Sequence, residues 1–162
     1  MTPDRTIFIV DGFNLYHSVC DASKDLGGIS TKWLNIRALC ESYLHLLGGT
    51  NVFEKLYYFS AYADHKVAQK PDTVIKHKAF IDCLKSTGAI YEMARFKAKD
   101  VWCENCRRMI VKHEEKETDV AISVKLIEVL LKNECDTAMM MTGDTDIAPA
   151  VRFVKKISHK KE

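Results

Sequence analysis

Hydrophobic residues along the chain form two kinds of pattern, short unbroken runs and helical spacings, which predict strands that alternate with helices. Residues 7–10 are apolar throughout, which is typical of a parallel strand buried on both faces. This run ends at Asp11, and we expect a loop from there to Tyr16. Residues 52–60 and 89–96 predict two further strands. Such an alternation favours a parallel sheet with helices on both of its faces.

Three helices are expected between these strands and the last strand. The first would follow a cap at Ser30 or Thr31, the second would run from Pro71 to Gly88, and the third would follow Asp119. Their apolar residues recur at steps of three and four, which should place them on one buried face of each helix. They are Ile36, Leu39, Cys40, Tyr43 and Leu47 in the first helix, Val74, Ile81 and Leu84 in the second, and Val120, Val124, Ile127 and Leu131 in the third.

Acidic residues follow two of the predicted strands. Asp11 closes the first, and an apolar stretch from residue 136 onward ends in Gly143 before Asp144 and Asp146, at the start of a last helix. Because ligands gather beyond the carboxyl ends of parallel strands, these acids can converge on one site, together with Asp119. Convergent carboxylates repel one another unless a cation lies between them, and carboxylates are the ligands that Mg²⁺ or Mn²⁺ prefers.

Each acid also has a purely structural interpretation. Asp144 can cap the last helix while Asp146 complements its dipole, Asp11 can form an Asx turn, and Asp119 can cap the helix that it begins. Taken singly, each is more often structural than functional. Their expected meeting at one sheet edge favours a divalent metal site.

Composition is that of one ordinary domain. The chain has 162 residues, 47% of them hydrophobic, and a net charge of +2, which excludes a general polycation. It contains no apolar run of membrane-spanning length and no signal-peptide pattern at its start. We therefore expect a cytoplasmic protein with no membrane partner.

A polar segment over residues 97–117 interrupts the alternation. It contains Cys103 and Cys106 at the spacing of metal ligands, and His113 or Cys20 could add a third ligand. A tetrahedral zinc site needs four ligands, so a reduced pair in a surface loop is favoured over a zinc site within one chain. A zinc ion shared across a dimer is left open.

The same segment supplies candidate contacts to RNA. Trp102 could stack on a base, and cations nearby could meet phosphates. Lys116 could also bind a substrate phosphate, although a lysine among glutamates is usually a solvated ion pair. The full set of aromatic and basic candidates for such a groove is Tyr16, Tyr62, Lys66, Lys97, Lys99, Trp102, Arg107 and Arg108.

Three separated blocks, residues 10–16, 115–120 and 142–146, resemble the signature blocks of the NYN domain family, a branch of the PIN-like metal-dependent nucleases. The resemblance covers nearly the whole chain. It implies a single α/β domain over residues 1–162, a three-layer PIN-like (Rossmannoid) fold with a mostly parallel sheet of order three, two, one, four, five. The strand before Asp144 would then lie beside the first strand.

One departure concerns the end of the chain. The family usually continues past the last helix into another strand, whereas the sequence here stops at Glu162, so either the chain is truncated or the sheet lacks that strand. Val151, Phe153 and Ile157 would then be partly exposed, which invites formation of a homodimer or instability.

The resemblance implies a metal-dependent endoribonuclease that hydrolyses RNA. Its implied catalytic residues are Asp11, Asn14, Asp119, Asp144 and Asp146, of which the four aspartates would bind Mg²⁺ or Mn²⁺. Asn14 and Thr142 would orient water or phosphate, and Lys116, Trp102, Arg107 and Arg108 would bind substrate. A non-catalytic nucleic-acid-binding module of the same fold is the first alternative. A phosphatase of the haloacid dehalogenase type is a weaker one, since its second aspartate is replaced by Phe13.

Overall fold

A five-stranded sheet forms the centre of the computed structural model, which describes residues 2–158. The strand order is β4-β3-β2-β1-β5, in which β1 pairs in parallel with β2 and β5, β2 pairs in parallel with β3, and β4 is antiparallel to β3. The strands are β1 (Arg5–Asp11), β2 (Val52–Ala61), β3 (Ile90–Cys103), β4 (Arg108–Lys116) and β5 (Thr137–Met141).

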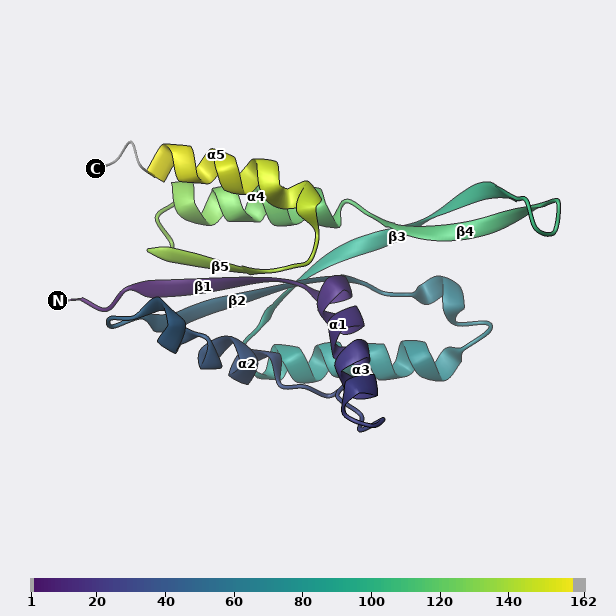
Figure 1. Cartoon of the computed structure of the whole chain (residues 1–162), viewed down its shortest axis with the longest axis horizontal. Helices are drawn as coiled ribbons and strands as arrows, with labels where there is room; N and C mark the ends of the chain where they lie inside the picture. The colour runs from purple at the N-terminus through teal and green to yellow at the C-terminus, as the bar shows by residue number, and fades with distance from the viewer. Residues whose placement is uncertain (1, 159–162) are drawn as a thin grey trace.

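Helices cover both faces of this sheet, with α4 and α5 together on one side and α1, α2 and α3 on the other (Figure 1). The predicted α/β class with a mostly parallel sheet is therefore confirmed. The helices are α1 (Gly12–Asp25), α2 (Ile36–Ser42), α3 (Pro71–Ser86), α4 (Thr118–Leu131) and α5 (Ala148–Ser158), with short 3₁₀ turns η1 (Leu44–Leu47), η2 (Asp64–Lys66) and η3 (Thr145–Ile147).

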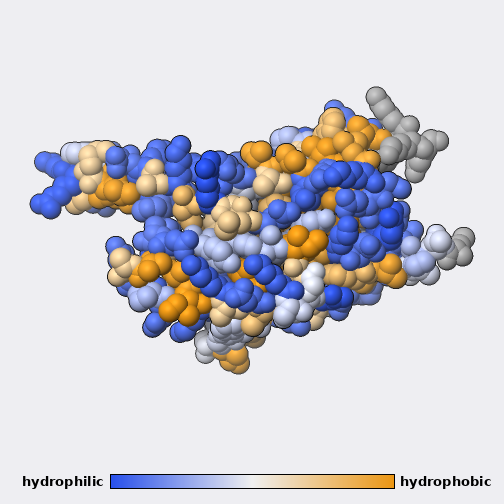
Figure 2. Space-filling model, turned by 180° about the vertical axis from the view of Figure 1, so that it is seen from behind, coloured by the Kyte–Doolittle hydropathy of each residue, from blue (hydrophilic) through white to orange (hydrophobic). Residues whose placement is uncertain are grey.

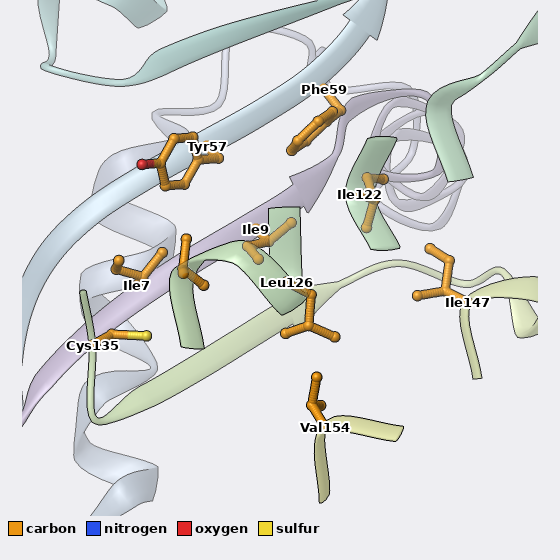
Figure 3. Close-up of a cluster of buried hydrophobic side chains, with 10 residues drawn as sticks. Ile7, Ile9, Tyr57, Phe59, Ile122, Leu126, Cys135, Ile147 and Val154 are labelled. Atoms are coloured by element: carbon orange, nitrogen blue, oxygen red, sulfur yellow. The ribbon is translucent and has the colours of Figure 1, made fainter. Parts of the chain in front are cut away.

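Side chains of β1 alternate between two apolar clusters. Ile7 and Ile9 pack beneath α4 and α5 (Figure 3), and Phe8 and Val10 pack against α2 and α3. Each of the four is at most 1% exposed. The prediction that this strand is buried on both faces is confirmed. Packing on both faces holds β1 in place, and with it Asp11, the last residue of the strand.

The predicted buried face of α4 is wrong, although the helix is present. Val120 and Val124 are 67% and 58% exposed. This helix is apolar on most of its circumference, so the spacing of its apolar residues fits more than one face and packing decides between them. The residues that enter the core are Thr118, Ile122, Leu126 and Val129, whereas Leu131 is exposed and Ile127 is half-buried.

The expected loop after Asp11 is a helix, α1, which begins at once at Gly12. Gly12 is buried and Leu15 packs against the core. Leu15, Val19 and Ala22 recur at steps of four and three, so the helical pattern is present, and the expectation of a loop after Asp11 overlooks it. The next helix also begins later than predicted. Asn35, rather than Ser30 or Thr31, caps α2 by accepting from the backbone N–H of Ala38 at 3.0 Å.

Residues 97–117 form a long antiparallel hairpin rather than an irregular insertion. β3 continues past the expected end of the third strand, and it pairs with β4 from Arg95 opposite Lys116 to Cys103 opposite Arg108. The hairpin projects beyond the carboxyl edge of the parallel strands (Figure 1), and hydrophilic side chains predominate on the face seen in Figure 2. The lysines of the hairpin account for the polar composition that the sequence shows over residues 97–117.

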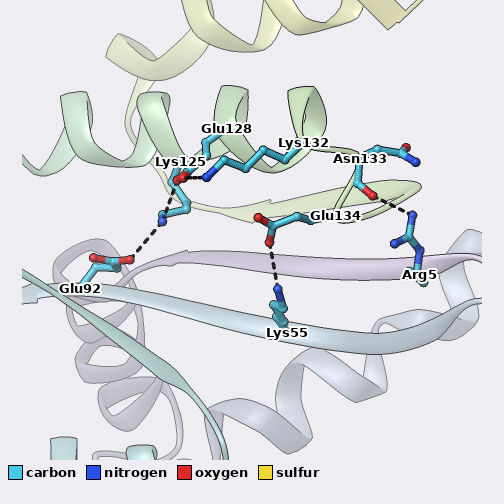
Figure 4. A network of polar contacts seen from close by, with 8 residues as sticks. All are labelled: Arg5, Lys55, Glu92, Lys125, Glu128, Lys132, Asn133 and Glu134. Carbon is cyan, nitrogen blue, oxygen red and sulfur yellow. Dashed lines mark hydrogen bonds and ion pairs between the residues drawn. The ribbon is translucent and has the colours of Figure 1, made fainter.

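Ion pairs fix α4 and the chain after it to the sheet (Figure 4). Lys125 joins α4 to β3 through Glu92 at 3.2 Å and contacts Glu128 of its own helix at 2.9 Å. Lys55 of β2 pairs with Glu134 at 2.9 Å, beyond the end of α4. These contacts attach α4 and the residues after it to the sheet. They thereby help to fix where the first turn of α4 lies.

Beyond β5 the described residues contain α5 and no further strand, so β5 is one edge of the sheet. Phe153 is 50% exposed, and Val151 and Ile157 are half-buried. A hollow of about 330 Å³ lies between α4, α5 and β5, lined mainly by Leu126, Leu130, Ala138, Met140, Val151 and Val154. Among the described residues no helix is both long and apolar enough to cross a membrane.

The corrected face of α4 leads to the first prediction. Ile122→Ala removes a side chain that is 1% exposed, so the free energy of unfolding should fall by about 2–4 kcal/mol. Val124→Ala on the same helix, at a residue 58% exposed, should change it by less than about 0.5 kcal/mol. Urea unfolding of both variants measures the difference. Equal losses would contradict the face that the structure assigns to the core.

Candidate functional site at the carboxyl edge of the sheet

The four aspartates singled out in the sequence come from three segments that end at the same edge. Asp11 is the last residue of β1, and Asp119 lies in the first turn of α4. Asp144 and Asp146 follow β5, at the start of η3. Because β1 and β5 are parallel neighbours, with Val10 beside Met141, Asp11 and the loop after β5 leave the sheet together.

Asp11 is the best-anchored of these acids and is only 2% exposed. Its Oδ1 accepts hydrogen bonds from the backbone N–H groups of Phe13 and Asn14 at 3.1 and 3.0 Å, which makes it the N-cap of α1. Its Oδ2 accepts from the Asn14 side-chain amide at 2.5 Å and from the Thr142 hydroxyl at 3.1 Å. Four donors therefore hold one buried carboxylate.

Thr142 connects the two strand ends. Its hydroxyl donates to Asp11 and accepts from the backbone N–H of Asp144 at 3.0 Å. Asp144 in turn accepts from the backbone N–H of Asp146 at 2.8 Å, so it caps η3 as the structural interpretation expected. Asp144 accepts one hydrogen bond and keeps lone pairs for other ligands. The acceptor sites of Asp11 are occupied by its four donors, so Asp11 can bind another ligand only in exchange for one of them.

Asp119 shows that the four carboxylates share one electrostatic environment. Burial raises the pKa of its carboxyl, and the negative charges of Asp144, Asp11 and Asp146, in that order, raise it further. Like charges that act on one another at this range destabilise the ionised cluster. A cation at this edge would relieve the repulsion.

The chemistry of these donors fits a hard divalent ion held partly through water. Within residues 2–158 no three His, Cys, Asp or Glu side chains are arranged to hold a metal ion directly. Mg²⁺ usually keeps several water ligands and takes one or two carboxylates from the protein, which suits this edge. Direct ligation by all four aspartates stays a prediction.

The predicted substrate-binding residues are not gathered at this edge. Lys116 ends β4 and pairs with Glu114 at 3.0 Å, as its structural interpretation expected. Trp102, Arg107 and Arg108 lie at the far end of the hairpin, about 27 Å along β4 from Lys116. These three residues cannot touch a substrate atom that lies among the aspartates.

The cysteine pair also lies at the hairpin tip. Hydrogen bonds from Cys106 lower the pKa of the Cys103 thiol. His113 is opposite Ala98, five residue pairs from the tip, and Cys20 lies in α1, so neither can complete a site with the pair. A zinc ion here would need two ligands from another molecule, and this stays a prediction.

Sequence reasoning missed two residues beside the aspartates. Arg95 forms an ion pair with Glu117, which directly precedes α4 and has a left-handed φ of 75°. Arg95 falls within the strand that the sequence predicted, but its partner lies 22 residues later in the chain. No local pattern could have shown that contact.

These features define an α/β domain with an acidic edge at the carboxyl ends of its parallel strands. A family model described as the NYN domain matches residues 5–161, so the chain belongs to the NYN domain family, within the PIN-like nuclease superfamily. The resemblance of the three sequence blocks is thereby confirmed.

One curated relative is 6-hydroxy-3-succinoylpyridine 3-monooxygenase HspA of Pseudomonas putida (strain DSM 28022 / S16). It is 28% identical over 183 aligned residues, which cover 94% of this chain and 56% of that protein. The chain thus spans about half the length of this relative. No solved structure matches the chain.

Gly12, the third residue of the first signature block, gives the next prediction. A Cβ at this position would lie 2.5 Å from Cζ of Tyr58 and 2.6 Å from the carbonyl oxygen of Phe59. Gly12→Ala should therefore lower the free energy of unfolding by about 1–3 kcal/mol, as overpacking does. Ser18→Ala, at an exposed position of the same helix, should stay within about 0.5 kcal/mol of wild type. A mild Gly12→Ala variant would show that α1 need not approach β2 so closely.

Charge repulsion at Asp119 gives a pH-dependent prediction. Because the folded-state pKa of Asp119 is raised, its contribution to stability is fully present below the ordinary carboxyl pKa and is lost as pH rises through the raised value. Asp119→Asn should therefore raise the free energy of unfolding at pH 7 by about 0.5–1 kcal/mol and have little effect near pH 3. Thermal melts across this range measure the difference. Asp82→Asn, at an exposed position of α3, is the control, and an equal effect in both variants would argue against repulsion in the cluster.

Proposed function

We propose that this protein is a divalent-metal-dependent endoribonuclease that hydrolyses the phosphodiester bonds of RNA. The observation that carries the proposal is the meeting of acids from separate segments at one edge of the sheet, where the hydroxyl of Thr142 joins Asp11 to the backbone of Asp144. Burial, and after it the negative charges of the other three aspartates, raises the pKa of Asp119, which agrees with this arrangement. Membership of the NYN domain family supports the same chemistry.

A cluster of acids needs a cation before it can act on a phosphodiester, because the substrate is also an anion. Asp119, Asp144 and Asp146 would hold Mg²⁺ or Mn²⁺, and Asp11 would contact it directly or through water. When bound, such an ion activates a water molecule and neutralises charge on the phosphate.

The polar residues around Asp11 have a positioning role in this proposal. Asn14 and Thr142 both donate to Oδ2 of Asp11, so they fix the direction of this carboxylate. Thr142 also fixes the backbone N–H of Asp144. A change of Thr142 would disturb two aspartates at once, whereas a change of Asn14 would disturb Asp11. Asn14 and Thr142 are therefore positioning residues, and a direct contact with water or phosphate is a further part of the proposal.

Two other functions give different outcomes in the same experiments. A nucleic-acid-binding module of this fold would bind RNA and leave it intact. The name of the relative HspA suggests oxygenation of a pyridine, which would consume dioxygen in the presence of 6-hydroxy-3-succinoylpyridine and a reductant. The carboxylate cluster favours hydrolysis, since oxygen donors of this kind suit a redox-inactive hard cation.

Cleavage of a circular single-stranded RNA tests the proposal, because only an endonuclease can open a circle. Wild-type protein should linearise it with Mg²⁺ or Mn²⁺ and not with EDTA. Asp144→Asn should be at least about a hundredfold slower, since the metal supplies several kcal/mol of transition-state stabilisation.

Asparagine keeps the oxygen that caps η3, so Asp144→Asn should melt at or above the wild-type temperature. Added Mn²⁺ should raise the melting temperature of the wild type more than that of the variant. Asp82→Asn serves as the control and should cut RNA at the wild-type rate. Cleavage that persists in EDTA or in Asp144→Asn would refute the proposed mechanism, and RNA binding without cleavage would identify the binding module.

A further inference from the structure

The β3–β4 hairpin has two chemically different faces. Residues opposite each other in an antiparallel pair project to the same side, and neighbours along a strand project to opposite sides. One face carries Phe96, Ala98, Asp100, Trp102, Met109, Val111 and His113. The other, which we name the hairpin basic face, carries Arg95, Lys97, Lys99, Val101, Cys103, Arg108, Ile110, Lys112, Glu114 and Lys116.

Charge contacts support this assignment of faces. The Nζ atoms of Lys116 and Lys112 lie 3.0 and 3.8 Å from the Glu114 carboxylate. The pKa of Glu114 is lowered chiefly by Lys116, then by Lys99 and by Lys112. These lysines therefore surround one glutamate, which leaves the hairpin basic face with a surplus of positive charge.

The opposite face is partly covered at its base, whereas the hairpin basic face is open. Phe96 and His113 pack on the ring of His65 in η2, with centroids 4.8 and 4.0 Å apart. By contrast, the side chains of Arg95, Lys112 and Lys116 are 70%, 62% and 48% exposed. Lys97, Lys99 and Arg108 on the same face are exposed as well. Exposed cations attract a polyanion even beside an acid, because surface ion pairs are weak.

This basic surface starts beside the acidic edge. Arg95 pairs with Glu117, two residues before Asp119, and Lys116 is opposite Arg95 in the hairpin. From there the basic face runs outward for about 27 Å. Its cations lie about 7 Å apart on β3, at residues 95, 97 and 99, and about 14 Å apart on β4, at residues 108, 112 and 116. Cations spread over such a length can follow the backbone of a single strand, which is flexible enough to adapt to their spacing.

We propose that the hairpin basic face binds the phosphate backbone of single-stranded RNA and leads the strand to the aspartates at the carboxyl edge. This inference rests on the proposed function for the direction of the strand. Trp102 lies on the opposite face of the hairpin, so the bases of the RNA need not stack on it. The hairpin basic face would therefore recognise the charge and the extended form of the RNA backbone rather than its base sequence.

Direct binding measurements test the inference without any cleavage. Fluorescence anisotropy of a labelled oligouridylate in EDTA would compare wild type with Lys97→Glu/Lys99→Glu/Lys112→Glu. The dissociation constant should rise roughly tenfold or more, and the slope of its logarithm against log salt should fall by about 2, as expected when three phosphate contacts are lost.

A matched control has the same change in net charge elsewhere. Lys76→Glu/Lys155→Glu/Lys156→Glu alters exposed lysines of α3 and α5 and should bind within about twofold of wild type. The variant Lys97→Gln/Lys99→Gln/Lys112→Gln removes the hairpin charges without adding acids, which guards against misfolding. Melting temperatures confirm that each protein is folded.

Several outcomes would overturn the inference. Equal weakening by the hairpin and control variants would indicate a diffuse effect of net charge, and an unchanged dissociation constant in the folded hairpin variants would remove the site altogether. Binding of a polyglutamate peptide as tight as that of RNA would show a general polyanion surface instead.

The comparison of substrates separates this inference from the nuclease proposal. If both hold, the hairpin variants should lose cleavage of long RNA but cut a trinucleotide, which is too short to reach along the hairpin, at the wild-type rate. If no RNA is cut by any variant, the proposed function fails while the binding comparison still decides the role of the hairpin.

Discussion

The hydrogen bond between Thr142 and Asp11 is the contact on which the acidic edge depends, because it joins two segments 131 residues apart in the chain. Parallel pairing of β1 with β5 brings the two strand ends side by side, but it does not fix the direction of any carboxylate. The hydroxyl of Thr142 does so by donating to Asp11 and accepting from the backbone of Asp144. Burial of Asp11 strengthens this arrangement, since an ionised carboxylate away from water must be fully hydrogen-bonded.

The core of the domain and the repulsion at its edge act against each other. Ion pairs and buried side chains hold α4 against the sheet, and the same packing places Asp119 near three other acids. A folded chain free of metal must tolerate this repulsion, and the apolar clusters on both faces of β1 supply the stability that allows it. Such stored repulsion is typical of functional sites, where a ligand is needed to balance the charge.

Much of this arrangement could be predicted from the sequence. The unbroken apolar run before Asp11 and the acids after Met141 identified both strand ends of the site, because buried parallel strands have a strong local signature. Helix α1 was missed although Leu15, Val19 and Ala22 have helical spacing, because the residues after Asp11 were expected to form a loop. The face of α4 was chosen wrongly because packing, rather than spacing, selects Ile122 over Val124. Contacts between distant residues, such as Arg95 with Glu117, follow from the fold alone.

The hairpin shows why a polar segment need not be irregular. β3 is parallel to β2 up to Ala94 and then continues past the carboxyl edge, where its pairing passes to β4. A strand that leaves the sheet has no helix layer to cover it, so its side chains must be charged or must face another molecule. The basic residues of this hairpin satisfy the first requirement, and their gathering on one face next to the aspartates fits the second. β3 thus has two roles. Its first part belongs to the parallel sheet that positions the acids, and its second part, paired with β4, forms a surface suited to a long anion.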